Sequence, residues 1–535
     1  MFSSDEESSS DESSDITNVR NESRPLVLTS SSDEIDTDNI DEVDNRDTEW
    51  TPINEVQRCE IVCDDELLLH NVDCDDPIAL YQLFVTDSVI EQMVLETNRY
   101  AIQCMEKDPH KNESRKHQSM WRPITSTDLY TFLGIVHIMG IVQLPEIRLY
   151  WSNNPMYANQ CIQKQMPRDR FLDILKYLHF SDNTANISTN RLCKFSELMD
   201  KINTNFQAAV KPGTKVVINE SIVPWRGRLS FKQYIPGKAH KYGVKHYKLC
   251  APGGYTFKFE VYAGKNGENI KISHSHDVVM RLMRECLDAN RILYTDSYYT
   301  SVPLAEELLQ HSTYICGTIK PNRRFLPEDA KKKQKRGECY SAINHNYVKF
   351  VKWTDKRTIC LLTTSPEHTC EIIESDNKRK PNAVFDYNTV KKRVDLSDQL
   401  ASYYSSLGKT IKWYKKIVFQ LICGTSVTNA WYIHQKFGTK KIDLLKFWES
   451  IIEKLLVEKT PVCRDVSKNR HFIDTLPGPS RKVRKRCVEC YKNVSNAEGP
   501  AMARLKATKV TTFCPQCPNK PSFCINCFKT VHKNQ

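Results

Sequence analysis

The sequence of 535 residues has no hydrophobic run long enough to cross a membrane. Its longest apolar stretch, FLGIVHIMGIV at residues 132–142, contains His137 and falls short of the roughly 18 residues that a membrane span needs. The first residues also lack the basic and apolar regions of a secretory signal peptide. We therefore expect a buried helix at 132–142, no membrane partner, and a cytoplasmic or nuclear protein.

Lysine is absent from the first 50 residues, where 16 Asp and Glu face 3 Arg and give a net charge of −13. Because the whole chain carries +11, residues 51–535 carry +24. A segment rich in Ser, Asp and Glu and poor in aromatics cannot bury enough surface to fold alone, so we predict that residues 1–70 form a disordered acidic tail. The basic remainder favours a polyanionic partner, most simply nucleic acid, over a merely lysine-rich surface.

A disulfide framework is also missing. Of the 20 cysteines, 14 are scattered singly through the first 463 residues, and six form three Cys-x-x-Cys pairs after residue 486. In a reducing compartment this pattern predicts free thiols in the body of the chain and metal binding in the tail.

Apolar residues recur with helical spacing between residues 76 and 210, in DPIALYQLFVTDSVIEQMVLETNRYA, TSTDLYTFLGIVHIMGIVQ and RDRFLDILKYLHF. From residue 214 the pattern changes to short strand-like runs: KVVINESIV, VKHYKLCA, YTFKFEVYAG, RILYTDSYY and TYICGTI. Helical patterns in HDVVMRLMRECLDA and SVPLAEELLQ separate the last three runs, which predicts an α/β sheet core.

Basic and polar segments between residues 321 and 385, including KKKQKR at 331–336 and NKRKPN at 377–382, indicate an insertion into this core. Helical character returns in VDLSDQLASYY and in WYKKIVFQLICGTSVTNAWYIHQ. A basic segment with Pro, Gly and Ser, TLPGPSRKVRKR, then introduces the cysteine-rich tail.

Three acidic residues lie where catalytic groups could gather. Asp296 ends the apolar run RILYTD, a position that holds a metal ligand rigidly, although a turn or N-cap aspartate is as ordinary there. Asp395 and Asp398 lie three apart in RVDLSDQL and share one face if this segment begins a helix. Two carboxylates so close favour a neutralising Mg²⁺, or else the partial positive charge of a helix N-terminus.

Several blocks together resemble one known family. INESIVPWRGRLSFKQYIPGKAHKYGVKHYKLC, LYTDSYYTSVPLAEELL and DYNTVKKRVDLSDQL occur in the order and spacing of the catalytic blocks of piggyBac-type transposases. The resemblance covers about residues 76–435 and the tail, and is strongest to the piggyBac transposable element-derived proteins. It implies an RNase H-like nuclease core whose acids bind two Mg²⁺ ions. Such a core would cut transposon ends and transfer strands into TTAA sites.

Carried over residue by residue, the resemblance places the second catalytic acid at Asp296 and the third at Asp395, with Asp398 as a further acid. The position of the first acid is Asn219, which departs from the family. An amide oxygen brings no negative charge to a dication, and Glu220 faces the opposite side of a strand. We therefore predict cleavage slowed by roughly a thousandfold or more; an active transposase is the alternative.

The resemblance also implies the architecture: an α/β RNase H-like core with an insertion, flanked by a helical DNA-binding and dimerisation domain, and followed by a small zinc module. A homodimer is expected. The predicted boundaries are 1–70 for the tail, 71–213 for the first part of the helical domain, 214–320 for the first part of the core, 321–385 for the insertion, 386–407 for the last core helix, 408–470 for the second helical part, 471–486 for the basic linker and 487–535 for the zinc module.

Two stretches, PWRGRLSFKQYIPGKAHKYGVKHYK and GKTIKWYKK, interleave basic residues with aromatic residues such as Trp225, Tyr234 and Tyr242. Basic groups neutralise phosphates, and aromatic rings stack on exposed bases. The resemblance sets the first stretch against transposon-end DNA; a basic loop and strand edge is the alternative. The predicted contacts to double-stranded DNA are Arg226, Arg228, Lys232, Lys238, Lys241, Lys245, Lys409, Lys412, Lys415 and Lys416.

The tail holds seven candidate zinc ligands, since a Cys-x-x-Cys knuckle places two thiolates about one tetrahedral edge apart. The resemblance implies a cross-braced module with two sites. One site consists of Cys487, Cys490, Cys524 and Cys527; the other uses Cys514, Cys517 and His532, with His471 or water as its fourth ligand. RKVRKR at 481–486 predicts nuclear localisation or a phosphate-contacting arm. A zinc-dependent reader of chromatin peptides is the remaining alternative.

Overall fold

A computed structural model of the chain describes residues 49–53, 63–107, 121–183, 190–236, 238, 240–264, 273–375, 378–391, 396–408, 412–456, 473–479, 483–515, 517 and 519–532. The chain divides into two compact units, Met1–Leu456 and Val457–Gln535. None of the helices within these ranges is long and apolar enough to span a membrane.

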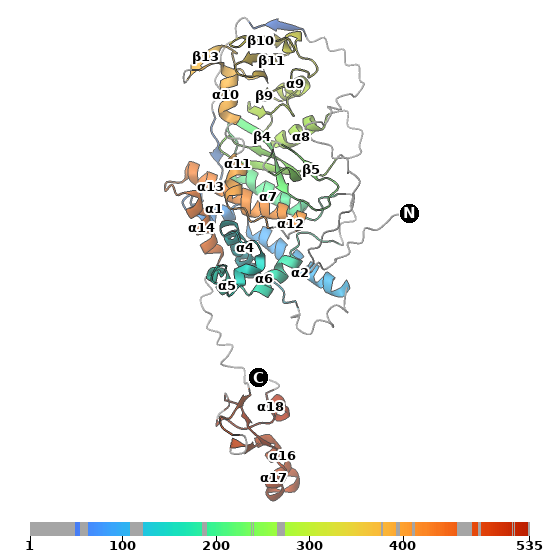
Figure 1. The fold of residues 1–535 in the computed structure, drawn as a ribbon, viewed down its shortest axis with the longest axis vertical. Coiled ribbons are helices and arrows are strands. Elements are labelled where there is room, and N and C mark those ends of the chain that lie inside the picture. The colour runs from blue at the N-terminus through green and yellow to red at the C-terminus, as the bar shows by residue number, and fades with distance from the viewer. Residues whose placement is uncertain are drawn as a thin grey trace, which may run out of the picture. The chain divides into compact units, whose positions relative to one another are not determined.

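The first unit is built on a ten-stranded mixed sheet (Figure 1). Its strand order is β1-β10-β11-β12-β9-β8-β4-β6-β5, and β7 also pairs with β6. β4 and β9 run parallel to β8, and the other neighbouring strands are antiparallel. The strands are β1 (Trp50–Pro52), β4 (Lys215–Pro224), β5 (Gln233–Tyr234), β6 (Tyr242–Cys250), β7 (Thr256–Val261), β8 (Ile292–Thr295), β9 (Tyr314–Thr318), β10 (Cys339–Asn344), β11 (Lys349–Thr354) and β12 (Thr358–Thr363).

Helices cover both faces of this sheet. On one face lie α8 (His274–Met283) and α9 (Val302–Gln310), and Arg281 of α8 pairs with Glu260 of β7. On the other face, α10 (Asn382–Lys391) buries Val384 and Tyr387 against Val217 and Tyr294. α11 (Leu396–Tyr403) follows α10 in the chain, and its contacts to the same face are described below. The strands and helices that the sequence predicts at residues 214–320 are therefore confirmed.

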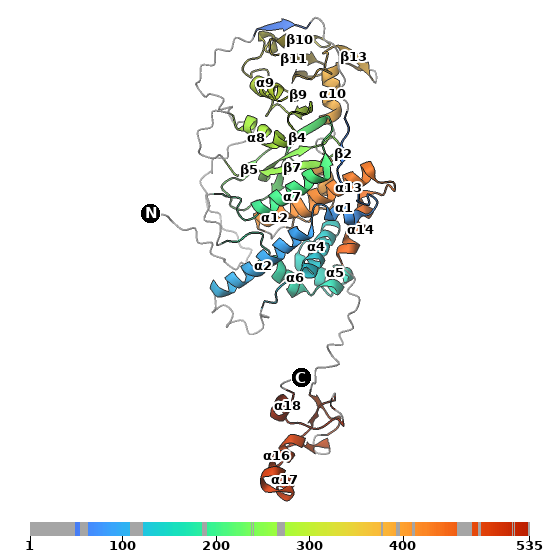
Figure 2. The ribbon, with the colours of Figure 1, turned by 180° about the vertical axis from the view of Figure 1, so that it is seen from behind.

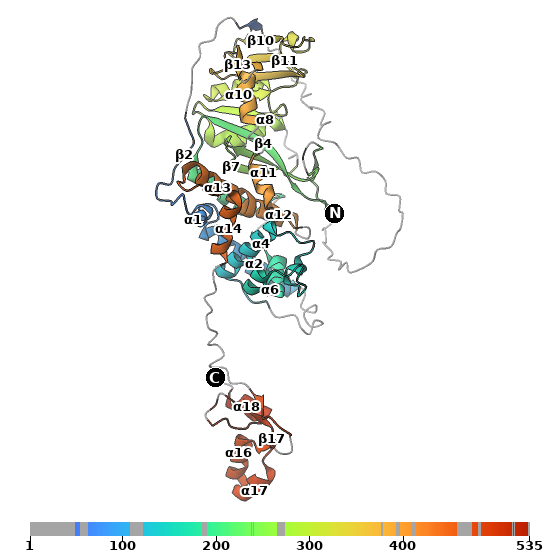
Figure 3. The same cartoon turned by 60° about the vertical axis from the view of Figure 1, so that its left-hand side comes forward.

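The remaining helices of the unit pack together although they come from distant parts of the chain (Figures 2 and 3). Trp448 of α14 donates a hydrogen bond to His137 of α4 over 2.9 Å, which confirms the predicted buried helix at 132–142. α12 and α13 form one helical run, joined by the π-helical segment Gln420–Thr425. The helices are α1 (Pro77–Gln82), α2 (Asp87–Lys107), α4 (Ser126–Ile141), α5 (Gln160–Gln165), α6 (Arg168–Tyr177), α7 (Ser196–Ala209), α12 (Trp413–Phe419), α13 (Ser426–Phe437) and α14 (Leu444–Leu455).

Two segments join the main structure in ways that composition does not indicate. β10, β11 and β12, from the insertion at 321–385, extend the main sheet beyond β9. Short strands β13 (Ile372–Ser375) and β14 (Lys378–Pro381) form a separate hairpin. From the segment 1–70, β1 pairs with β10, and β2 (Glu66–Leu67) pairs with β3 (Val210–Lys211). These residues of the predicted disordered tail are ordered because the rest of the chain supplies their pairing partners.

The second unit is small and has three helices among its described residues. They are α16 (Val488–Glu498), α17 (Pro500–Lys506) and α18 (Ile525–Val531). β15 (Asp474–Thr475) pairs with β18 (Thr512–Phe513), and β16 (Lys485–Arg486) pairs with β17 (Lys509–Val510). Its buried cluster consists of Cys487, Cys514 and Phe523, a core too small to fold such a unit without further cross-links.

A charged network joins α10 to the centre of the sheet. Asp386 of α10 accepts hydrogen bonds from Lys215 of β4 at 2.6 Å and from Tyr294 of β8, and contacts His368 at 3.1 Å. Burial alone would raise the pKa of the Asp386 carboxyl, but these partners hold it well below its usual range. The network therefore attaches the segment after β12 to the first strand of the core.

We predict that Asp386→Asn lowers the free energy of unfolding by about 2 kcal/mol at neutral pH, because Lys215 loses its counter-ion. Since the folded pKa lies below the unfolded one, this contribution is present above about pH 4 and lost as the pH falls further. Urea unfolding followed by tryptophan fluorescence measures both effects. The exposed pair of Asp355 and Arg336 provides the control. Asp355→Asn should cost less than about 0.5 kcal/mol, and equal losses in the two variants would contradict the prediction.

Candidate functional site

Side chains of β4 alternate between the two faces of the sheet at the predicted catalytic position. Asn219 and Ser221 both donate hydrogen bonds to Asp398 of α11, and the distance from Asn219 Nδ2 to Asp398 Oδ2 is 3.3 Å. Glu220 instead pairs with Lys245 of β6, with 2.6 Å between its Oε2 and Nζ. Glu220 therefore faces away from Asp398, as the alternation of a strand predicts.

The amide of Asn219 is fixed in one orientation. Its Oδ1 accepts the backbone N–H of Glu220 at 2.8 Å, while its Nδ2 donates to Asp398. A flipped amide would set its oxygen against the carboxylate and its NH₂ against an N–H donor, so the observed assignment is the one with complementary partners. Asn219 thus presents a donor to Asp398 where a metal ligand would have to present an acceptor.

A lysine that the sequence analysis did not consider completes this cluster. Lys248 lies opposite Asn219 in the antiparallel register of β4 and β6. Its side chain is 0% exposed, and its Nζ lies 2.6 Å from Asp398 Oδ1. Burial alone would raise the pKa of Asp398, but the Lys248 ammonium and the Ser221 hydroxyl hold it below its usual value. The cluster therefore consists of the Lys248–Asp398 ion pair and two further hydrogen-bond donors to Asp398, Asn219 and Ser221.

Asp296 directly follows β8 and makes the turn that the sequence analysis gave as the ordinary alternative. Its Oδ1 accepts the backbone N–H of Tyr298 at 2.9 Å, and its backbone carbonyl accepts from Thr300. Burial and the charge of Glu220 raise the pKa of its carboxyl. Asp296 therefore acts as a turn residue in the structure. Its raised pKa also shows that its carboxyl lies in an unusual electrostatic environment.

Three predicted site residues, Asp395, Lys409 and His471, lie outside the described residues. Within the described ranges, the groups of three or more Cys, His, Asp or Glu that could share an ion are the two in the tail. The described part of the nuclease-type site does not fit Mg²⁺, because both oxygens of Asp398 already accept protein donors and one of these donors is a cation.

The predicted DNA contacts divide by exposure. Lys232 and Lys238 are half-buried, in the segment between β4 and β6. Lys245 is buried against Glu220, so its charge is balanced inside the fold. The exposed residues among the predicted contacts that the structure describes are Arg226, Arg228, Lys241 and Lys412.

Two lysines of α12 are buried and hold neighbouring segments together. Lys415 Nζ donates to the carbonyl oxygens of Leu175 and Lys176 at 2.7 and 3.0 Å, and burial lowers its pKa to about 7. Lys416 Nζ lies 3.4 Å from the Pro224 carbonyl oxygen and over the Trp225 ring. In this structure both ammonium groups bind backbone carbonyls inside the fold rather than facing solvent.

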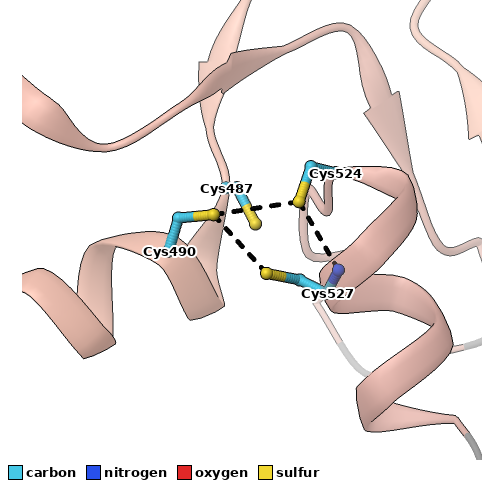
Figure 4. Close-up of side chains that lie close together, drawn as sticks. All are labelled: Cys487, Cys490, Cys524 and Cys527. Carbon is cyan, nitrogen blue, oxygen red and sulfur yellow. Dashed lines mark hydrogen bonds between the residues drawn. The ribbon is translucent and has the colours of Figure 1, made fainter.

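The tail brings its ligands together in the two groups that the resemblance implied. In the first, Cys490 Sγ lies 3.8 Å from Cys524 Sγ and 3.4 Å from Cys527 Sγ, with Cys487 beside them (Figure 4). In the second, Cys517 Sγ lies 3.1 Å from His532 Nε2, and Cys514 completes the group. Sulfur atoms on one tetrahedral zinc ion lie about 3.8 Å apart, so the first group fits four-coordinate zinc.

Within the first group, burial raises the pKa of Cys490 and Cys527, whereas the pKa of Cys524 is lowered. Cys524 caps the N-terminus of α18, and its sulfur accepts the backbone N–H of Cys527 at 3.5 Å. Burial would raise the pKa of Cys524, but this N–H and the neighbouring thiols lower it to about 7. A thiol with this pKa is deprotonated readily, as a zinc ligand must be.

Comparisons with known proteins agree with this architecture. A family model described as Transposase IS4 matches residues 76–431. PiggyBac transposable element-derived protein 3 of Homo sapiens is 26% identical over 449 residues, which are 78% of this chain and 73% of that protein. PiggyBac transposable element-derived protein 2 of Homo sapiens is 25% identical over 69% of this chain, and the match spans 64% of that protein.

Among solved structures, the cryo-EM structure of a piggyBac transposase synaptic complex with hairpin DNA has the same fold, with a TM-score of 0.65. The match covers 80% of this chain and 96% of that chain at 22% sequence identity. Because this family model matches more than half of the chain, the chain is a member of the transposases. Within that class the chain belongs to the piggyBac-type family, which confirms the resemblance of its motifs.

We predict that each ligand group binds one zinc ion, and that Cys524→Ser and Cys517→Ser each remove one ion from the chain. Native mass spectrometry of the full chain measures this. Cys161→Ser, at an exposed single cysteine, is the control and should keep both ions. Chelation should unfold the second unit alone, because both ligand groups lie in it. Tryptophan fluorescence should not change, because all eight tryptophans lie in the first unit. Loss of zinc from the control would contradict the prediction.

We also predict that Lys248→Met lowers the free energy of unfolding by about 3–5 kcal/mol, because it leaves the Asp398 carboxylate buried without its counter-ion. In Lys248→Met/Asp398→Asn most of this loss should be recovered, since neither charge remains. Urea unfolding of the two single variants and the double variant gives the coupling between the two side chains. Additive losses would show that Lys248 and Asp398 do not stabilise each other.

Proposed function

We propose that this chain is a transposase-derived protein that binds double-stranded DNA and no longer cleaves it. The carrying observation is the orientation of Asn219, whose amide N–H bond points at Asp398 in place of the acid that the family has there. Metal-assisted phosphoryl chemistry needs oxygen ligands that converge on the ion. At this position the chain supplies a hydrogen-bond donor instead.

The topology supports an RNase H-like core for the central part of the chain. β7, β6, β4, β8 and β9 lie side by side in that order, and α8 and α9 connect β7 to β8 and β8 to β9. Three antiparallel strands beside two parallel ones, with the position of the first acid on β4 and the candidate acids Asp296 and Asp398 after β8 and on α11, are the arrangement expected of such a nuclease. On this assignment β10 to β12 are an insertion that lengthens the same sheet.

DNA binding is supported by the exposed charges between β4 and β6. Arg226, Arg228 and Lys241 are exposed there, and their segment leaves the sheet directly after the strand that carries Asn219. The matched synaptic complex contains hairpin DNA, and this chain shares its fold. Basic side chains that neutralise phosphates would bind a duplex in a salt-dependent way. A nuclear location and a homodimer are part of this proposal.

Zinc is proposed as a structural ion of the second unit, which lacks an adequate apolar core of its own. A zinc module can read DNA or a peptide, so a chromatin reader remains a second candidate for the tail alone. An active transposase is disfavoured by the donors that surround Asp398.

The test is a binding and cleavage assay of the zinc-loaded full chain on a labelled duplex selected by the chain from a random DNA library. We expect a retarded complex without cleavage products in either Mg²⁺ or Mn²⁺. Arg226→Ala/Arg228→Ala should weaken binding and reduce the slope of log affinity against log salt by about 2, because each lost phosphate contact contributes about 0.9.

The matched control is Lys356→Ala/Arg357→Ala, which removes two exposed basic residues from the turn between β11 and β12. This control should bind DNA as the unchanged protein does. Cleavage that disappears in Asp296→Ala would overturn the proposal and establish an active enzyme. Absence of any DNA binding would overturn it in favour of the peptide reader.

A further inference from the structure

Both oxygens of the Asp398 carboxylate accept hydrogen bonds from groups of the sheet. Its Oδ1 accepts the Lys248 ammonium at 2.6 Å, and its Oδ2 accepts Asn219 Nδ2 at 3.3 Å together with the Ser221 hydroxyl. These donors come from the paired strands β4 and β6, whose register is continuous through all three positions. A dication that approached Asp398 would have to displace donors held by the backbone of the sheet.

A buried lysine at residue 248 destabilises the fold unless its charge is compensated. Its side chain is 0% exposed, and it stands in the run VKHYKLC, all of which is buried in the sheet. An ammonium taken out of water is destabilising unless an opposite charge and hydrogen bonds compensate for it. Asp398 supplies both, at a charge-assisted hydrogen-bond distance.

The charges of this cluster balance without an ion. Asn219 and Ser221 are neutral, and Lys248 and Asp398 cancel, so the four side chains sum to zero. A carboxylate at residue 219 would give the cluster one negative charge, and the ammonium would still lie beside Asp398. Restoring the acid would therefore leave a fixed cation next to the position where a dication would bind, and like charges repel.

We propose that Lys248 is the resident counter-cation of this site: its ammonium takes the place beside Asp398 that a divalent cation would need, so the site excludes such a cation even when residue 219 is a carboxylate. This inference rests on the proposed function. It adds a second reason why a divalent cation would not bind, at a strand position outside the acidic motifs. Lys248 acts here as a positioning residue for Asp398, and it has no role in a reaction.

The test is equilibrium binding of Mn²⁺ to the zinc-loaded full chain, with free Mn²⁺ measured by electron paramagnetic resonance. The unchanged protein and Asn219→Asp should show no Mn²⁺ site that Asp398→Asn removes. Asn219→Asp/Lys248→Met should gain an Mn²⁺ site at least about 10- to 100-fold tighter than any residual Mn²⁺ binding by Asn219→Asp, the range typical of changes around metal ligands. Adding Asp398→Asn to this double variant should abolish the gain.

The matched control is Asn219→Asp/Lys349→Met. Lys349 of β11 is also a buried strand lysine, but its Nζ donates to the carbonyl oxygens of Ser365 and His368 in the segment after β12. This control should bind Mn²⁺ no better than Asn219→Asp. A gain equal to that of the Lys248 variant would mean that any lost lysine charge has the same effect, and would overturn the proposal.

Two further outcomes would also overturn it: an Asp398-dependent Mn²⁺ site in the unchanged protein, or an Asp398-dependent Mn²⁺ site in Asn219→Asp. Both comparisons use chains that keep Lys248, so they decide the question even if Lys248→Met prevents folding. DNA binding without cleavage by the unchanged protein supports the proposed function whatever the manganese result is. The two proposals therefore fail through different measurements.

Discussion

The pairing of β4 with β6 on one side and β8 on the other determines which side chains meet in the first unit. The antiparallel register sets Asn219 opposite Lys248, and strand alternation sends Glu220 to the other face. A one-residue shift would exchange the faces of every side chain on β4, including the buried Val217. No small rearrangement can therefore bring Glu220 to Asp398, so on our proposal Glu220 cannot replace an acid at residue 219.

Much of the fold could be predicted because its determinants are local. Short strand-like runs predicted β4, β6, β7, β8 and β9, and helical spacing predicted α4, α8 and α9. Motifs predicted the tail cysteines that the structure brings together, whereas the catalytic roles of Asn219 and Asp296 stay predictions. Lys248 was missed because its partner lies 150 residues away in the sequence. Its one local signal is a lysine inside an apolar strand, a pattern that a solvent-facing edge produces equally well.

Counting charges in the sequence overestimates the basic surface for a related reason. Lys245, Lys415 and Lys416 contribute to the net charge, yet each is buried with a carboxylate or carbonyl partner. A basic residue beside aromatic residues is typical of a nucleic-acid contact. The same pattern is equally typical of a buried basic residue that binds the backbone of another segment. Exposure decides between the two, and it depends on packing between α12 and distant segments. Of the predicted DNA contacts that the structure describes, the exposed ones lie mainly between β4 and β6.

A nuclease core built from clustered carboxylates depends on cations, because the like charges destabilise the fold when no ion is bound. In this chain the Lys248–Asp398 pair removes that dependence at the described part of the site, since the compensating charge is covalently part of β6. On our proposal the first unit would therefore keep its fold, and with it the exposed basic segment after β4, without a divalent ion. Only the second unit, whose core is mostly cysteine, would still require metal. Folding and metal binding would thus be separated between the two units of one chain.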